Sequence, residues 1–509
     1  MMRNIFKGFV FSILGAFMLM GCGNDNVVDP TSEPEDTTGS NEEGVDIDSL
    51  TQQHADISWM VMLHAATPPT NVVIEEIEVK TNTSLDVLWV PDAARDERIN
   101  TGLVSGELAD IVTLTDLNNS SVRGALASGM FWEISDYLDE FHYLSMITED
   151  RRESAAIEGN LYGVPIQAWQ SRSGLTIRKD WLDQLGLEVP QTVDELFEVV
   201  QAFSNNDELG SSWGWVGRNN LSGSGFLHIL TALGGPVNWG MNEAGEFYSM
   251  YETEAWVETM DFFRELFENN YINQDWAVTA TAEQNTLFAQ GQAGIFPGMA
   301  GINSLYNETA EMNDDFELVA AVINGPDGEP RVPTEGNGIG GLLAFPKSYV
   351  ETEEDLLRIL AFVDQMISEE LYYLTIGGIP GVHHEIDENG IYQILDQDAW
   401  QQDAQPLSSL RPSVITYRQT VDNPTIRHAH DLIEANEDYV VIDPSRPYNS
   451  ETFNERGTEL NQLMEDATVQ YIMGVIDLDE FNSVLNDWQE RGGTKIAEEF
   501  TENYREING

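Results

Sequence analysis

The sequence is poor in cysteine and in basic residues. Its 509 residues include one Cys, at position 22, so no disulfide can form within the chain. Lys and Arg number 24 against 87 Asp and Glu, which gives a formal net charge of −63. Because such a surface would repel the phosphate backbone of a nucleic acid, we expect no nucleic-acid binding.

Long hydrophobic runs are also scarce. The apolar run at residues 8–20 follows two basic residues and is too short for a comfortable membrane span, but it is typical of a signal-peptide core. It leads into Leu-Met-Gly-Cys at 19–22, which resembles the bacterial lipobox, where the cysteine receives a diacylglyceryl group and becomes the new N-terminus. A Cys buried in a core would not explain these flanks. We predict a signal peptide at 1–21 and a lipidated Cys22, which anchors the protein at the extracytoplasmic face of the cell membrane.

The rest of the chain predicts an α/β protein with more than one lobe. Residues 22–54 form an acidic, polar linker after the lipidated cysteine, and we expect this linker to be disordered. A chain of this length, with 41% hydrophobic residues, exceeds what one core usually supports. Strand-like and helix-like segments then alternate, which is typical of a parallel sheet. We expect strands at 57–63, 84–90 and 110–114, and helices at 71–81 and up to about 107.

Local signals predict further elements. Thr192 with Glu195, and Asp477 with Glu480, have the spacing of helix-capping pairs. The segment 323–331 contains Asn-Gly and Asp-Gly and predicts a turn between strands. Amphipathic patterns predict helices at 254–270, at 353–368 and over much of 454–504.

Several segments of the sequence stand in an order typical of one protein family. They are LYGVP with LTIRKDWLDQLGL (161–187), TVDEL (192–196), LFAQGQAGIF (287–296), GGIPGVHHEI (377–386) and the C-terminal helical run at 477–504. Together they resemble the extracellular solute-binding lipoproteins (family 1) of bacterial carbohydrate ABC transporters. The resemblance covers most of residues 55–509. It implies a two-lobed periplasmic-binding-protein-like fold, with a mostly parallel sheet flanked by helices in each lobe and crossover hinges between the lobes.

The resemblance also implies how the chain is divided and what it does. We expect an N-terminal lobe of residues 55–170 plus about 335–400, and a C-terminal lobe of 171–334 plus about 401–509. The protein would be the monomeric substrate-binding component of an importer. It would capture an oligosaccharide by hinge closure and deliver it to the transmembrane subunits of an ABC permease.

The segment between the first two family motifs predicts the floor of the ligand cleft. In the family, the residues that follow this strand face the ligand, and here they include Gln167, Trp169 and Arg172. A Trp ring offers a flat face to a pyranose, and an Arg offers a fork of donors to hydroxyls or to a uronate. The alternative is that Trp169 belongs to the core and that Arg172 pairs with a surface acid.

Other ligand-binding candidates follow from the same alignment of motifs. The alternatives are a helix cap for Asp116, a structural role for His64, and a surface or core role for Trp239 and Trp400. Maltodextrin binders carry a Trp that stacks on the sugar at the position of Met299. A Met at this position offers a weaker apolar contact to the face of a sugar ring. The candidates are His64, Thr115, Asp116, Trp239, Met299, Glu335, Asn337 and Trp400.

Signatures of catalysis and of metal binding are missing. The sequence has no GxSxG, HExxH or P-loop, so we predict no catalytic residue, no cofactor and no enzyme activity. His383-His384 and His428/His430 have no spaced third ligand, and 204–215 lacks the alternating oxygen ligands of a calcium loop. Two alternatives remain: an extracellular lipoprotein glycoside hydrolase and a peptide or amino-acid binder. The net charge favours a neutral saccharide, although a local Arg would reverse that preference.

Overall fold

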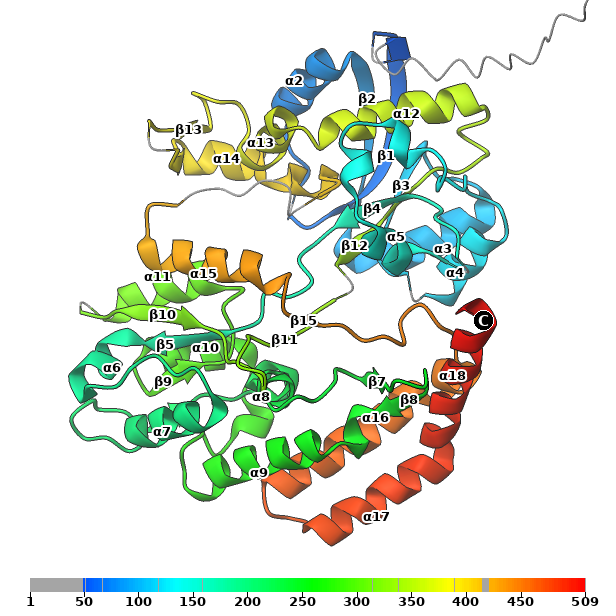
Figure 1. The fold of residues 1–509 in the computed structure, drawn as a ribbon. Coiled ribbons are helices and arrows are strands. Elements are labelled where there is room, and N and C mark those ends of the chain that lie inside the picture. The colour runs from blue at the N-terminus through cyan, green and yellow to red at the C-terminus, as the bar shows by residue number, and fades with distance from the viewer. Residues whose placement is uncertain are drawn as a thin grey trace, which may run out of the picture. The chain divides into compact units, whose positions relative to one another are not determined.

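Two sheets, each covered by helices, organise the chain (Figure 1). The computed structural model describes residues 49–508 apart from 51, 66, 118, 158, 314, 337, 389 and 414–420. The predicted signal peptide, Cys22 and most of the linker lie outside the described residues. Residues 46–509 form one unit.

The first sheet has five strands, and its middle strands are buried on both faces. Strand β1 pairs in parallel with β2 and β3, whereas β12 runs antiparallel to β3 and β4. Four strands therefore point one way and β12 the other, which agrees with the predicted mostly parallel sheet. The spatial order is β2 (Thr83–Pro91), β1 (Ala55–Leu63), β3 (Ile111–Leu114), β12 (Ile339–Ala344) and β4 (Val164–Gln167).

Helices pack around this sheet and define the first lobe. The helix predicted at 71–81 is confirmed as α2, and the one predicted to reach about residue 107 ends at Ser105 because Gly106 takes a left-handed conformation. The helices are α2 (Val72–Thr81), α3 (Arg95–Ser105), α4 (Ser120–Ala127), α5 (Glu149–Ala155), α12 (Glu353–Met366), α13 (Glu369–Gly377) and α14 (Gln397–Asp403). A small hairpin of β13 (His384–Ile386) and β14 (Tyr392–Ile394) precedes α14.

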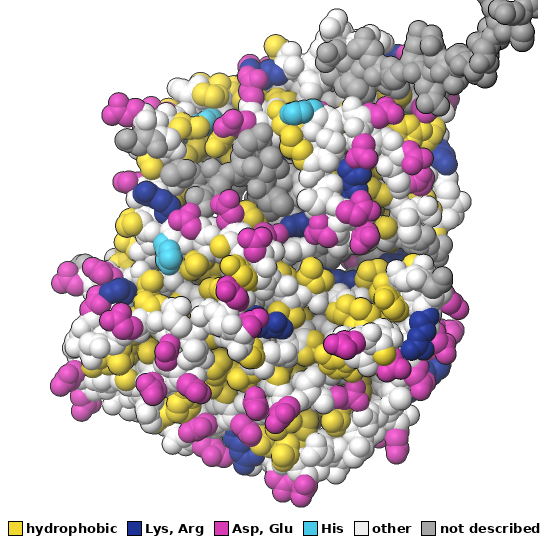
Figure 2. Space-filling view, in the orientation of Figure 1, with side chains coloured by type: hydrophobic (Ala, Val, Ile, Leu, Met, Phe, Trp, Pro, Cys, Tyr) yellow, Lys and Arg dark blue, Asp and Glu magenta, His cyan; other side chains and the backbone are white. Residues whose placement is uncertain are grey.

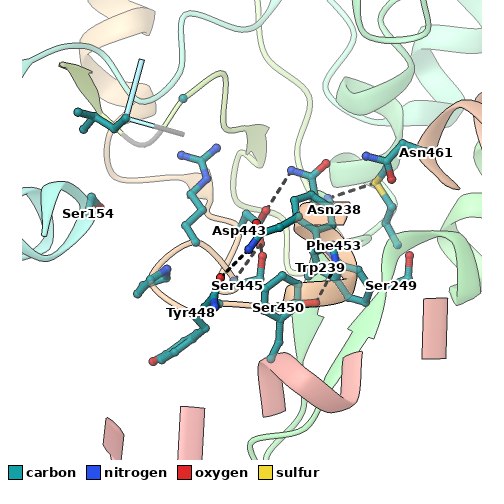
Figure 3. Close-up of a pocket in the computed structure, with 18 of the residues that line it drawn as sticks. Ser154, Asn238, Trp239, Ser249, Asp443, Ser445, Tyr448, Ser450, Phe453 and Asn461 are labelled. Atoms are coloured by element: carbon teal, nitrogen blue, oxygen red, sulfur yellow. Dashed lines mark hydrogen bonds between the residues drawn. The ribbon is translucent and has the colours of Figure 1, made fainter. Parts of the chain in front are cut away.

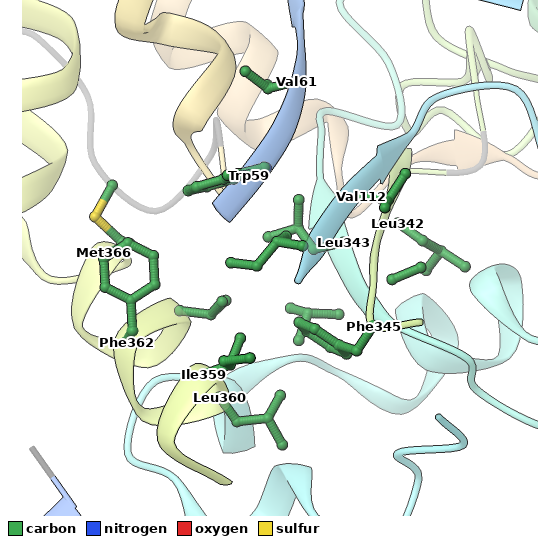
Figure 4. Close-up of a cluster of buried hydrophobic side chains, with 14 of the residues drawn as sticks. Trp59, Val61, Val112, Leu342, Leu343, Phe345, Ile359, Leu360, Phe362 and Met366 are labelled. Carbon is green, nitrogen blue, oxygen red and sulfur yellow. The ribbon is translucent and has the colours of Figure 1, made fainter. Parts of the chain in front are cut away.

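The core of the first lobe lies between β1, β12 and α12 (Figure 4). Trp59 on β1 meets Phe362 on α12 edge to face, with ring centroids 6.1 Å apart. Leu407 and Leu410, in a short 3₁₀ segment after α14, are also buried in this cluster. These leucines follow residue 400 and pack with the first lobe, and the lobe boundaries expected from the sequence stay a prediction.

The second sheet, which defines the second lobe, has four strands. Strand β5 runs antiparallel to its neighbours β10 and β9, and β9 pairs in parallel with β6. The order is β10 (Leu318–Ala321), β5 (Leu175–Arg178), β9 (Ala293–Phe296) and β6 (Trp213–Trp215). Its helices are α6 (Lys179–Leu185), α7 (Val193–Phe203), α8 (Phe226–Ala232), α9 (Glu254–Glu268), α10 (Thr281–Ala289), α11 (Ile302–Met312) and α15 (Pro424–Asn436).

The C-terminal end of the chain adds a helical layer to the second lobe (Figure 1). It consists of α16 (Glu451–Ile472), α17 (Leu478–Trp488) and α18 (Thr494–Asn508), and it packs beside α9 and the hairpin of β7 (Trp239–Met241) and β8 (Phe247–Ser249). The capping pairs predicted from the sequence are confirmed. Thr192 Oγ1 accepts from Glu195 N at the start of α7, and Asp477 and Glu480 form a reciprocal capping box at the start of α17.

The turn predicted at 323–331 is present, because the amide of Gly325 donates to the carbonyl of Glu329 at 2.7 Å. It leads into β11 (Val332–Pro333), which pairs in parallel with β15 (Val440–Val441) close to the junction of the lobes. Within the described part of the chain, none of the helices combines the length and apolarity needed to cross a bilayer.

Burial in the first core predicts a large difference between two valine positions. Val61 on β1 is fully buried, whereas Val104 on α3 is 91% exposed. We expect Val61→Ala to lower the free energy of unfolding by about 2 kcal/mol, because two buried methyl groups are lost and a cavity is left. Val104→Ala is the control and should change it by less than about 0.5 kcal/mol. Urea denaturation of both variants measures the difference, and equal losses would contradict the placement of β1 in the core.

Candidate functional site

Two chain segments cross between the lobes side by side. Residues 168–174 lead from β4 to β5, and residues 334–338 lead from β11 to β12. The amide of Ala168 donates to the carbonyl of Gly338 at 2.8 Å, and the amide of Glu335 donates to the carbonyl of Gln170 at 2.8 Å. The two crossovers are thus joined by backbone hydrogen bonds and form one connection between the lobes.

A buried ion pair holds this connection. Arg151 on α5, with its side chain 6% exposed, donates to the carbonyl oxygens of Ala168 and Gly338 and pairs with Glu437, which follows α15. The second carboxylate oxygen of Glu437 accepts the amide of Gln170 at 2.7 Å. One guanidinium and one carboxylate therefore connect a first-lobe helix, both crossovers and a second-lobe helix.

The crossover residues predicted from the sequence bond mainly to one another. Arg172 Nε donates to Glu335 Oε2 at 3.2 Å, and Ser173 Oγ donates to Glu335 Oε1 at 2.9 Å. Trp169 is half-buried and packs on a small apolar cluster that contains Met299. The structure thus brings together two pairs of predicted residues, Arg172 with Glu335 and Trp169 with Met299, and places half-buried Gln167 beside them at the end of β4.

Met299 packs tightly beneath the first crossover. A Cβ atom added at Gly174 would lie 2.6 Å from the Met299 sulfur and 3.0 Å from the carbonyl oxygen of Ala321. Only glycine allows so close an approach. Met299 is 1% exposed, so its present contacts are with the protein interior.

The remaining predicted residues lie at separate places in the first lobe. His64 Nδ1 is 2.7 Å from Asp92 Oδ2 on the surface, and the indole N–H of Trp400 donates to the carbonyl of Ile376 at 2.7 Å. Thr115 and Asp116 follow β3 and line a cavity of about 10 Å³. Within the described residues the Thr115 hydroxyl has no hydrogen-bond partner. Asn337 is not among the described residues.

A larger cavity, of about 530 Å³, lies between the two lobes (Figure 3). The first lobe contributes residues that follow β3 and the end of α5, and the second lobe contributes β7, the loop at 442–450 and α16. Trp239 is the one sequence-predicted residue among the described residues of this wall. Polar and aromatic side chains that line it include Arg123, Ser154, Asn238, Trp239, Asp443, Arg446, Tyr448, Phe453 and Asn461.

Asp443 organises the loop that forms the second-lobe wall. Its Oδ1 accepts from the amide and the hydroxyl of Ser445, at 2.9 and 2.8 Å, and its Oδ2 accepts from Asn238 Nδ2 at 3.0 Å (Figure 3). Burial raises the pKa of Asp443, while these hydrogen bonds oppose the shift. Burial also lowers the pKa of the neighbouring Arg446, and the attraction of Asp443 opposes that change.

A second carboxylate holds the helix beside this loop. Ser450 caps the N-terminus of α16, and Glu499 on α18 accepts from its hydroxyl at 2.5 Å and from the amide and hydroxyl of Thr452, both at 2.9 Å. Burial alone would raise the pKa of Glu499, but these bonds and Lys495 outweigh it and bring the pKa to about 2. Glu499 is therefore ionised at neutral pH, where a helix N-terminus favours negative charge.

Sequence reasoning missed most of this wall. The segment YVVIDPSRPYNS at 439–450 has a signal that was not used: an acid, an Arg, a Tyr and an Asn interleaved with two prolines directly after a strand-like run. Asp443 bonds to Asn238, which lies 205 residues away in sequence, and Ser450 bonds to Glu499, which lies 49 residues away. The residues next to Asp443 and Ser450 therefore do not indicate these partners.

The histidine pairs bond within the protein. Ile379 N donates to His383 Nδ1 at 2.9 Å, His383 Nε2 lies 3.2 Å from Asp403, and His384 Nδ1 lies 3.0 Å from the carbonyl of Gly377. No cluster of three or more His, Cys, Asp or Glu that could hold a metal ion occurs among the described residues.

Comparison with known proteins identifies the family. Residues 69–372, more than half of the chain, match the model of the bacterial extracellular solute-binding proteins. The chain belongs to this family. The polygalacturonan/rhamnogalacturonan-binding protein YtcQ of Bacillus subtilis (strain 168) is 38% identical over 457 residues, which cover 88% of this chain and 91% of that protein. The lipoprotein LipO of the same organism is 27% identical and covers 97% of both chains.

Solved structures show the same fold. An HMO-binding solute-binding protein from Bifidobacterium longum infantis has a TM-score of 0.68 at 18% identity, covering 89% of this chain and 98% of that one. The alginate-binding protein AlgQ2 has a TM-score of 0.60 at 18% identity, covering 90% and 99%. The two-lobed fold expected from the sequence is thus confirmed.

The buried pair at the crossovers predicts a large loss of stability when it is broken. We expect Arg151→Met to lower the free energy of unfolding by about 3–5 kcal/mol, because it leaves the partly buried Glu437 carboxylate and two crossover carbonyl oxygens without the guanidinium that binds them. Arg505→Met is the matched control, since Arg505 and Glu246 are both 56% exposed, and such surface pairs contribute less than about 1 kcal/mol. Urea denaturation checks both variants, and a loss in Arg151→Met no larger than in the control would contradict a structural role for the pair.

Proposed function

We propose that this protein is the substrate-binding component of a bacterial carbohydrate ABC importer and that it holds a saccharide in the cavity between its lobes. The observation that carries the proposal is a cavity of about 530 Å³ with walls from both lobes. Aromatic, amide and hydroxyl side chains line it, and these groups suit sugar rings and hydroxyls. Membership of the solute-binding family and relatives named for binding polygalacturonan and fructooligosaccharide support the same assignment.

The proposed mechanism is a shift between open and closed lobes. A ligand that contacts both walls binds the closed form more tightly, and this difference in affinity moves the equilibrium toward closure. The crossovers and the Arg151–Glu437 pair lie at the junction, so the lobes would move about them. A micromolar dissociation constant, about −8 kcal/mol, is sufficient for capture. The closed form would then dock on the transmembrane subunits of the permease as a monomer.

The cavity favours binding over glycoside hydrolysis. A glycosidase places two carboxyl groups on either side of the scissile bond. Among the described residues that line this cavity, the one carboxylate is that of Asp443, and three hydrogen bonds hold it to its own loop and to Asn238. A peptide or amino-acid binder would need sites for both an ammonium and a carboxylate group, so these ligands belong in the same test.

A thermal-shift screen tests the proposal. We expect one or more oligosaccharides to raise the melting temperature of the purified protein, whereas amino acids and peptides leave it unchanged. A hundredfold excess over Kd corresponds to about 2.7 kcal/mol of stabilisation. Each hit is repeated on Tyr448→Ala, in the cavity wall, and on Trp169→Ala, at the crossover. A shift lost in Tyr448→Ala assigns the ligand to the cavity, and a shift lost in Trp169→Ala alone assigns it to the crossover floor.

Two outcomes of this screen count against the proposal. A peptide hit without any saccharide hit would favour the amino-acid class of ligand. A saccharide that is cleaved during incubation, as seen by chromatography of the recovered ligand, would favour the hydrolase.

The proposed location is the extracytoplasmic face of the cell membrane, through a lipid on Cys22. The lipobox-like residues 19–22 and the lipoprotein relative that covers 97% of the chain support this location. In cells fed an alkyne-labelled fatty acid, we expect the protein to carry the label and to sediment with membranes. Cys22→Ser should lose both properties, because the thiol is the acylation site. A serine variant that keeps the label would contradict the assignment.

A further inference from the structure

Cations are few in this chain, and most of its arginines are already paired. Acidic side chains are scattered over the visible face in Figure 2, where basic ones are sparser. Among the described residues, three arginines have no hydrogen bond or ion pair from the guanidinium. Ten others pair with a carboxylate, and four donate to neutral oxygens. The three without a partner are Arg98, Arg123 and Arg446.

Two of these three arginines line the same cavity from opposite lobes. Arg123 lies on α4 of the first lobe, and Arg446 lies in the loop at 442–450 of the second. Both side chains are half-buried. A chain with 63 more acids than bases offers many carboxylates for pairing, yet among the described residues neither of these two guanidinium groups forms an ion pair at this cavity.

Among its described residues, the cavity holds no carboxylate that forms an ion pair with either arginine, although Asp443 attracts Arg446 from within the same loop. Asp443 is the one carboxylate among the described lining residues, and Ser445 and Asn238 occupy both of its oxygens. A partly buried guanidinium without an acceptor costs free energy, and a ligand that brings an acceptor recovers it. The planar fork of donors on Arg matches a carboxylate, which can accept two parallel hydrogen bonds.

We propose that the cavity selects saccharides that contain a uronic acid, with Arg123 and Arg446 as the residues that bind its carboxylate groups. This inference rests on the proposed function, since it names the substrate class for the same site. Because the two guanidinium groups come from different lobes, an anionic ligand gains both contacts when the lobes close on it. Charge recognition and hinge closure are then parts of one binding event.

Isothermal titration of the purified protein with three matched probes tests this inference. The probes are trigalacturonate, its trimethyl ester, which has the same sugar without the charge, and maltotriose. We expect trigalacturonate to bind and each neutral probe to bind at least tenfold more weakly. Arg123→Gln and Arg446→Gln should each weaken the binding of trigalacturonate by about tenfold to a hundredfold, because each loses a charged hydrogen bond.

Two further variants test whether the loss of affinity comes from a direct contact with the ligand or from the change in the net charge of the protein. Arg98→Gln removes the same charge from another unpaired arginine in the first lobe that does not line the cavity, and it should leave Kd unchanged. Arg446→Lys keeps the charge but loses the fork, so its affinity should fall between those of the wild type and Arg446→Gln. Circular dichroism confirms that each variant is folded before titration.

The outcomes distinguish the inference from the proposed function on which it rests. If the ester or maltotriose binds as tightly as the acid, the protein binds saccharides but does not select uronic acids, and the inference alone fails. An Arg98→Gln effect equal to that of Arg123→Gln and Arg446→Gln also overturns it, since net charge would then explain the loss. If no saccharide of any kind binds in this titration or in the wider screen, the proposed function fails as well.

Discussion

The ion pair between Arg151 and Glu437 fixes how the two lobes are joined. Arg151 uses its donors on a carboxylate and on the carbonyl oxygens of Ala168 and Gly338, so the crossovers cannot separate without leaving a buried cation unsatisfied. The cavity depends on the same contact, because Ser154 follows Arg151 on α5 and Gly336 lies two residues before Gly338. This charged contact, together with the backbone hydrogen bonds between the crossovers, therefore positions the two walls of the cavity relative to one another.

Overall charge and local charge lead to different expectations for the ligand. The net charge of −63 favours a neutral saccharide when it is treated as a property of the whole surface. Screening at physiological ionic strength, however, limits the reach of exposed charges to about 8 Å. A ligand inside the cavity interacts mainly with the groups that line it, and Arg123 and Arg446 outnumber Asp443 there among the described residues. Local composition is thus the better guide to specificity in so acidic a protein.

Sequence patterns predict the local elements well and the long-range contacts poorly. Helix α2, the cap at Thr192 and the capping box at Asp477 follow from periodicity and spacing, since a few neighbouring residues decide them. Arg151 and its partner are 286 residues apart, and nothing near either residue indicates the other. The crossover residues were found through family resemblance. The loop at 442–450 was missed because its structure depends on Asn238, in a distant hairpin.

The match to the family model ends at residue 372, whereas half of the described residues that line the cavity lie beyond it. The segment that matches the family model thus contains the second sheet, the first sheet apart from β1, and both crossovers, whereas the last quarter of the chain supplies Arg446, Tyr448 and their neighbours. Under the proposed function, substitutions in this last quarter would change which ligand is held while the sheets and the crossovers stay as they are. Such proteins could then diverge in the ligand that they bind without any change in the segment that matches the family model.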